Sequence, residues 1–239
     1  FMEQAPFGGV TYFSWLLNGL LVTIALFVCA WLLAFALGSV FGIMRTTPSK
    51  PLRTIGTAYV AVFRNIPLIV QFFVWYLIGP ELLPGAAQEW FKAELNPNIQ
   101  FFIVSVLCLG FFTGARVCEQ VRSGIMALPK GQRNAALAMG LTVPQAYRYV
   151  ILPNAYRLIL PPLTSEMLNM VKNTAVAQTI GLIELSAQAN RLLEFSAHAY
   201  ESFIAVTIAY ILLNFALMQI MRMVEGKYSI PGRAGVKYA

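Results

Sequence analysis

Long apolar blocks alternate with short charged segments along this chain. A bilayer core about 30 Å thick requires about 20 apolar residues in a helix. The blocks therefore predict five membrane-spanning helices, of which the fourth, which contains Glu166, is the least hydrophobic. Lipid offers the backbone no hydrogen-bonding partners, so these spans must be helices. The predicted spans are residues 13–44, 54–79, 99–128, 157–177 and 200–222.

The composition excludes several classes of protein. The chain has 239 residues, of which 58% are hydrophobic and 11% charged, whereas soluble domains carry about 25% charged residues. A soluble enzyme, a secreted disulfide scaffold and a disordered tail are all excluded. The net charge of +7 comes from dispersed basic residues, so we expect no nucleic acid partner. One His and three Cys without a CxxC pair predict no metal site.

Basic residues collect in alternate connections between the predicted spans. The opposite set of connections is rich in Glu and contains only Lys92 and Arg191 as cations. Lys and Arg favour the cytoplasmic side of a membrane. The pattern therefore predicts a periplasmic N-terminus and a cytoplasmic C-terminus. The connections assigned to the cytoplasm contain Arg45, Lys50 and Arg53, then Arg122, Lys130, Arg133, Arg148 and Arg157, then Arg222, Lys227, Arg233 and Lys237.

The predicted cytoplasmic loop at residues 129–156 is neither apolar enough to span nor polar enough to be disordered. Its Ala-rich first part favours a helix, and Gly140 is suited to the left-handed turn that ends one. Thr142 and Gln145 match a capping box that starts a second helix, which Pro153 is expected to end. Two short helices at a tight turn indicate a rigid knob for a partner's groove. An interfacial re-entry segment is the alternative.

The motif within this loop resembles the EAA loop of ABC importer permeases. Asn134-Ala135-Ala136 is followed after three residues by Gly140, and after nine more by Val150-Ile151-Leu152-Pro153. The family pattern is EAA-x3-G-x9-I-x-L-P. This chain departs from it at Asn134, where the family has Glu, and at Val150, where the family has Ile.

Other segments resemble the polar amino acid uptake subgroup of these permeases. They include Phe63 to Leu68 (FRNIPL) and Lys172-Asn173-Thr174. Ala115 to Ile125 (ARVCEQVRSGI) and Ser196 to Phe203 (SAHAYESF) are similar to the glutamate/aspartate permeases within it. The resemblance covers most of the chain.

The resemblance implies a fold and an assembly. The expected fold is an all-α integral membrane domain over residues 1–239, the five-helix transmembrane domain of a type I ABC importer. Expected partners are a second permease chain (a heterodimer is favoured, a homodimer is possible), two cytoplasmic ATP-binding subunits, a periplasmic amino-acid-binding protein, the amino acid substrate and membrane lipid. The coupling positions are Asn134, Ala135, Ala136, Gly140, Leu152 and Pro153.

The chain has no phosphate-binding loop of the form GxxxxGK[ST]. ATP and Mg²⁺ therefore belong to the partner subunit, and we expect no cofactor and no catalytic residue here. The chain is expected to be a translocation subunit in a bacterial inner membrane.

Ionisable residues inside spans are functional candidates because burying them is costly. Arg116 can grip a carboxylate of an acidic amino acid with two hydrogen bonds. A second carboxylate then needs a cation or amide, and the ammonium needs a carboxylate. Arg116 and Glu119 can instead pair with each other, and we expect a structural or gating role for Arg64. The candidate substrate-binding residues are Arg116, Glu119, Glu166, Asn169, Lys172, Asn173 and Thr174.

Three alternatives remain. Within the family, the substrate can be glutamine, asparagine or another polar amino acid, including a basic one. A secondary transporter or channel would not need the EAA spacing, and the chain shows no inverted repeat. An intramembrane enzyme would need a nucleophile–base pair or paired carboxylates, and no such pattern stands out.

Overall fold

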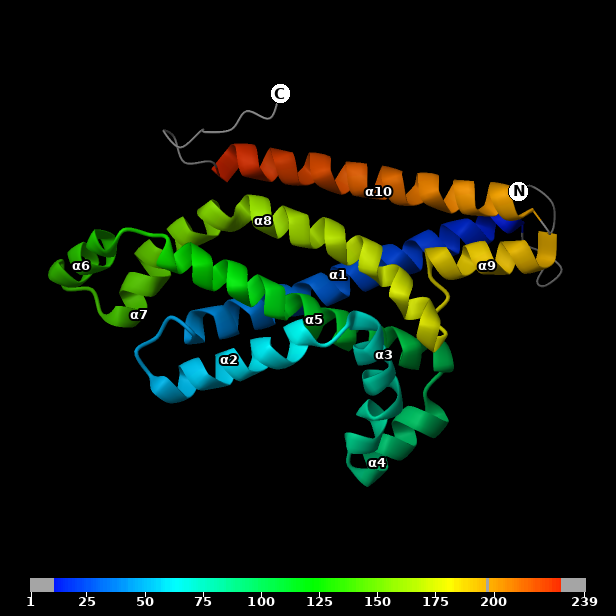
Figure 1. Ribbon diagram of the computed structural model, residues 1–239, viewed down its shortest axis with the longest axis horizontal. Helices are drawn as coiled ribbons and strands as arrows, with labels where there is room; N and C mark the ends of the chain where they lie inside the picture. The colour runs from blue at the N-terminus through cyan, green and yellow to red at the C-terminus, as the bar shows by residue number, and fades with distance from the viewer. Residues whose placement is uncertain (1–10, 197, 229–239) are drawn as a thin grey trace.

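The computed structural model describes residues 11–196 and 198–228, and it is helical along almost all of that length. Figure 1 shows long helices lying side by side along one axis, with short helices at both ends and to one side. The elements, in chain order, are α1 (Tyr12–Met44), α2 (Lys50–Asn65), α3 (Leu68–Leu77), η1 (Gly79–Leu82), α4 (Gly85–Glu89), η2 (Trp90–Glu94), α5 (Pro97–Met126), α6 (Lys130–Ala138), α7 (Val143–Ala146), η3 (Tyr147–Ile151), α8 (Leu152–Asn173), η4 (Thr174–Ile180), α9 (Leu185–Ser196) and α10 (Ala199–Tyr228).

Three of the described helices, α1, α5 and α10, are long and apolar enough to cross a membrane. The pair α2–α3 makes a fourth if it counts as one bent span. The helix α8 does not reach the same hydropathy, yet its 22 residues give it a length of about 33 Å. It packs against α5 and α10 inside the bundle. Contacts with those helices hold it in place despite its lower hydropathy.

The second predicted span, residues 54–79, differs from the structure because it is broken. Its two halves, α2 and α3, meet at an angle of 105°. Ile66 is extended with φ −94° and ψ 130°, as expected for a residue that precedes a proline. The Gln71 side chain then donates hydrogen bonds to the carbonyls of Phe63 and Ile66 at 2.8 and 2.9 Å. These bonds satisfy backbone acceptors that the break leaves open.

The loop of residues 129–156 contains the two expected helices, α6 and α7. Gly140 has φ +86° between them, and the Thr142–Gln145 capping box is present. Pro153 does not end the second helix, however. The chain passes through the π turn η3 directly into α8, where Pro153 lies in the first turn. Pro153 is tolerated there because it lies at the junction of the π turn and α8, where the regular α-helical hydrogen bonds have not yet begun.

Glycines bring α1 and α5 into close contact. A Cβ on Gly38 would lie 2.5 Å from the Val117 side chain, and one on Gly42 would lie 2.7 Å from Val121. Both distances are too short for real atoms, so the two helices can approach only because glycine stands at these positions. The α1–α5 pair forms the centre of the bundle on which the other helices assemble.

The two ends of the bundle differ in what they carry. The short helices α6 and α7 lie at one end, while α9 and the start of α10 lie at the other (Figure 1). A side projection contains α3, η1, α4 and η2. Within this projection, a hydrogen bond from Lys92 holds the pKa of the Glu81 carboxyl below its usual value.

Candidate functional site

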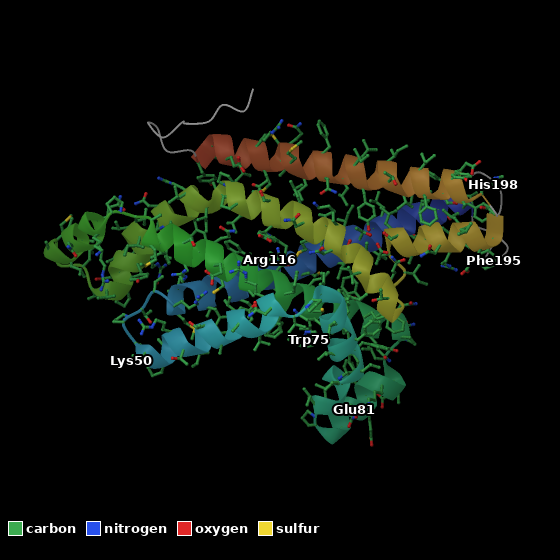
Figure 2. All side chains as sticks on the ribbon, viewed as in Figure 1. Lys50, Trp75, Glu81, Arg116, Phe195 and His198 are labelled. Carbon is green, nitrogen blue, oxygen red and sulfur yellow. The ribbon has the colours of Figure 1, made fainter. Side chains whose placement is uncertain are left out.

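A charged cluster lies in the middle of the bundle. Arg116 of α5 faces Glu166 of α8, with 4.0 Å between the Nη1 and Oε2 atoms. Arg64, at the end of α2, also acts electrostatically on the Glu166 carboxylate. Figure 2 places Arg116 near the midpoint of the long axis, between the α6–α7 end and the α9 end. Three helices thus contribute two cations and one anion to a single region.

The Arg116 guanidinium has hydrogen-bond donors that its contact with Glu166 does not use. Its contact with Glu166 is at the outer limit of an ion pair, and its side chain is 41% exposed. Its Nε is buried and has no hydrogen-bond partner among the described residues. The guanidinium carbon lies 4.9 Å from the centre of the Phe112 ring, which supports it from behind. Arg116 is therefore held in place and can still donate two hydrogen bonds to a bound carboxylate.

The other predicted substrate residues separate into those that share a helix face with Glu166 and those that do not. Asn169 and Asn173 follow Glu166 at spacings of three and seven, which places them along one side of α8. Both are half-buried. Lys172 is exposed, and Thr174 is buried with its hydroxyl donating to the Val171 carbonyl at 2.7 Å. The structure thus brings Arg116 and Glu166 together and places the two amides along the same side of α8 as Glu166.

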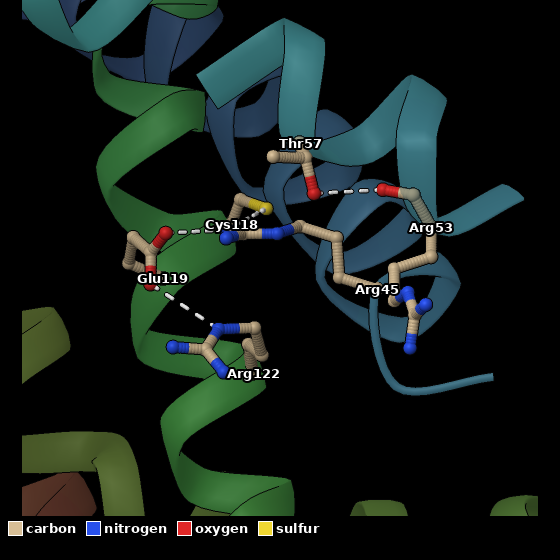
Figure 3. A network of polar contacts seen from close by, with 6 residues as sticks. All are labelled: Arg45, Arg53, Thr57, Cys118, Glu119 and Arg122. Carbon is tan, nitrogen blue, oxygen red and sulfur yellow. Dashed lines mark hydrogen bonds and ion pairs between the residues drawn. The ribbon is translucent and has the colours of Figure 1, made fainter. Parts of the chain in front are cut away.

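Glu119 belongs to a different network, shown in Figure 3. Arg45, from the end of α1, forms an ion pair with it, and Arg122 donates to it at 3.3 Å. Arg45 also contacts the thiol of Cys118. Arg116 accordingly pairs with Glu166, and the alternative pairing with Glu119 is not seen. Sequence reasoning missed this network because it assigned Arg45 to a connecting loop.

A second polar cluster, which the sequence did not reveal, lies where α9 begins. Glu184 is fully buried, and its carboxylate accepts hydrogen bonds from the backbone amides of Ser186 and Ala187, both at 2.9 Å. The hydroxyls of Tyr210 and Thr23 donate to it at 2.9 and 3.5 Å. The carboxylate therefore joins α1, α9 and α10. Its sequence neighbourhood is merely polar and gives no signal of this arrangement.

The predicted coupling positions lie on α6, on the turn after it and at the start of α8. Asn134, Ala135 and Gly140 are exposed, whereas Ala136 is buried against the rest of the loop. Leu152 and Pro153 open α8. The exposed part of the α6–α7 pair lies at the far end of the bundle, where another chain can reach it (Figure 1).

A helical bundle with a charged centre and an exposed two-helix loop is the arrangement expected of the transport subunit of a membrane importer. Residues 34–230 match the model of the family described as "Binding-protein-dependent transport system inner membrane component". The chain belongs to this family. It is thus an inner membrane permease, the translocation component of a transporter in which a separate subunit hydrolyses ATP.

Individual members of the family are similar to this chain to different degrees. The chain is 63% identical over 237 residues to the glutamate/aspartate import permease protein GltJ of Escherichia coli strain K12, covering 99% of this chain and 96% of that one. It is 28% identical to the glutamate/aspartate import permease protein GltK of E. coli O6:H1, covering 84% and 88%. A crystal structure of an amino acid ABC transporter with histidines has the same fold, with a TM-score of 0.74 and 28% identity over 90% of this chain and 95% of that one.

Proposed function

We propose that this chain is the permease subunit of an ATP-driven importer of acidic amino acids. The observation that carries the proposal is the 63% identity to a glutamate/aspartate import permease along nearly the whole of both chains. The charged cluster supports it chemically. An acidic amino acid has two carboxylates and one ammonium, and each needs a partner in a desolvated site.

In this proposal Arg116 binds one carboxylate. Arg64, for which the sequence alone indicated a structural or gating role, attracts the other carboxylate. Glu166 accepts the ammonium, and the amides of Asn169 and Asn173 complete the polar face. Lys172 is exposed near the end of α8 and is assigned to the edge of the pathway, whereas Thr174, buried just after α8, is assigned to its support. Glu166 lies 4.0 Å from Arg116 and partly neutralises it. Substrate therefore replaces a weak internal ion pair with closer contacts.

The proposed assembly pairs this chain with a second permease chain. A heterodimer is favoured because one E. coli strain has two different proteins named glutamate/aspartate import permease, GltJ and GltK. The segment of residues 129–156 docks on the ATPase subunits in the cytoplasm, and a periplasmic binding protein delivers substrate to the opposite end. The N-terminus is then periplasmic and the C-terminus cytoplasmic. Closure of the ATPases on ATP moves the docked loops and switches the pathway between its two openings.

Replacement of Arg116 tests the substrate site. In the complex reconstituted with both permeases, the ATPase and the binding protein, we expect Arg116→Ala to reduce glutamate-stimulated ATP hydrolysis at least tenfold, since a hydrogen bond to a charged group contributes about 1.5–3 kcal/mol. The matched control is Arg157→Ala, which removes an exposed arginine of α8 and is expected to leave stimulation unchanged.

The same assay with a panel of amino acids tests the substrate class. We expect glutamate and aspartate to stimulate hydrolysis strongly in the wild-type complex, and glutamine, asparagine and arginine to stimulate it weakly. Equal stimulation by glutamine would favour a permease of broader specificity. Undiminished stimulation by glutamate in Arg116→Ala would remove Arg116 from the site.

A further inference from the structure

The ion pair between Arg116 and Glu166 is an open one. A guanidinium that hydrogen-bonds a carboxylate comes within about 2.7–2.9 Å of it, whereas the Arg116 Nη1 and Glu166 Oε2 atoms are 4.0 Å apart. Arg116 is the only ion-pair partner of Glu166 among the described residues. Opposite charges inside a bundle attract each other more strongly than in water, because the dielectric constant there is lower. Another contact must therefore hold the guanidinium back from the carboxylate.

The ring of Phe112 is placed to make that contact. Phe112 lies four residues before Arg116 on α5, so the two side chains share one face of the helix. Long side chains on a helix lean toward its N-terminus, and Arg116 accordingly lies over the Phe112 ring, with its Cζ 4.9 Å from the ring centre. The ring is 6% exposed, so packing fixes its position. Its face attracts the guanidinium and opposes a movement toward Glu166.

No other polar contact within the described part of the chain accounts for the position of Arg116. Its Nε has no hydrogen-bond partner there, and its one ion pair is the open contact with Glu166. The guanidinium is thus held between an aromatic face on its own helix and a carboxylate on α8. The balance between these two attractions sets the distance between Arg116 and Glu166.

We propose that Phe112 is a positioning residue that keeps the Arg116–Glu166 pair open for the substrate. The ring holds the guanidinium against α5, so that its free donors remain available to a substrate carboxylate and Glu166 remains available to the ammonium. Without the aromatic face, the guanidinium closes onto Glu166, and the substrate must first break a full ion pair. Such preorganisation raises affinity by removing a cost of binding. The inference rests on the proposed function, because it concerns the same substrate site.

The experiment measures equilibrium binding of radiolabelled glutamate to the purified complex of both permeases and the ATPase subunits, by scintillation proximity. The share of binding that Arg116→Ala removes defines this site. Phe112 is replaced by phenylalanines with one, two and three ring fluorines, which withdraw negative charge from the ring face and nearly preserve its shape. We expect affinity for glutamate to fall at each step, roughly fivefold for the trifluoro ring, which corresponds to about 1 kcal/mol of cation–π attraction. Phe112→Leu removes the ring and is expected to weaken binding at least as much.

The matched control is the same trifluoro ring at Phe72, a fully buried aromatic of α3 that contacts no cation among the described residues. Binding is expected to be unchanged there, and an equal loss at Phe72 would overturn the inference in favour of a general effect of fluorine on packing. Constant affinity across the Phe112 series, with Arg116→Ala still removing binding, would overturn this inference alone and leave the proposed function intact. Full binding by Arg116→Ala would overturn the proposed substrate site together with it.

Discussion

Glu184 shows what a single buried carboxylate can do for this bundle. It receives four hydrogen bonds, two from backbone amides and two from hydroxyls, at a position with no exposed surface. The donors come from α1, α9 and α10. Burial raises the pKa of the Glu184 carboxyl above its usual range, and the hydrogen bonds from these donors oppose that rise. Glu184 therefore holds the start of α9 against α1 and α10, at the end of the bundle opposite α6 and α7.

We predict that Glu184→Leu lowers the apparent melting temperature of the purified complex strongly. The substitution removes the carboxylate that accepts from four buried or part-buried donors, at a cost of about 3 kcal/mol or more. Glu184→Gln retains one oxygen and is expected to cost less. Glu194→Leu makes the same change at an exposed position of α9 and is expected to have little effect. Equal melting temperatures for the two Leu variants would contradict this role.

At the scale of the element, the shape of each helix depends on residues that set backbone geometry. Pro67 divides the second span into α2 and α3, whereas Pro153 lies in the first turn of α8 and does not interrupt it. Proline thus breaks the helix at one position and is accommodated in it at the other. The difference arises from position, because a proline in the first turn removes a donor that has no partner there.

The contact between α1 and α5 depends on Gly38. We predict that Gly38→Ala destabilises the complex by about 1–3 kcal/mol, because the new methyl group overlaps Val117 and the Gly114 carbonyl. Gly85→Ala is the control, since a Cβ there meets nothing within 4 Å. The double variant Gly38→Ala/Val117→Ala should recover part of the loss in a thermal melt. Failure to recover any of it would indicate that the backbone contact with Gly114 dominates.

The turn between α6 and α7 requires a left-handed residue. Gly140 has φ +86° and open space around it, so Gly140→Ala costs about 1–2 kcal/mol through backbone strain alone. We predict that this variant co-purifies with less ATPase subunit than wild type, because the α6–α7 pair no longer keeps its shape. Gly131→Ala, in the same loop and also in open space, is the control. Normal co-purification of Gly140→Ala would mean that the turn does not set the docking surface.

At the scale of the whole molecule, some features followed from local chemistry. The apolar blocks identified α1, α5 and α10 because the bilayer sets a minimum helix length. The capping box and Gly140 identified the α6–α7 loop because both act within a few residues. The EAA-like spacing in that loop, with other matching segments, indicated the permease family, which the family match over residues 34–230 confirmed. These signals need no knowledge of distant contacts.

The sequence by itself therefore determined the class of protein, its helical membrane fold and the place of the α6–α7 loop. Only the tertiary structure decided which charges meet. Arg116 lies beside Glu166 and Glu119 beside Arg45 because α8 and α1 pack on different sides of α5. Pro67 marks the break between α2 and α3 locally, but the 105° angle at that break and the burial of Glu184 depend on packing. The physical reason is that an ion pair between helices depends on their relative rotation and depth, and neither is encoded in local spacing.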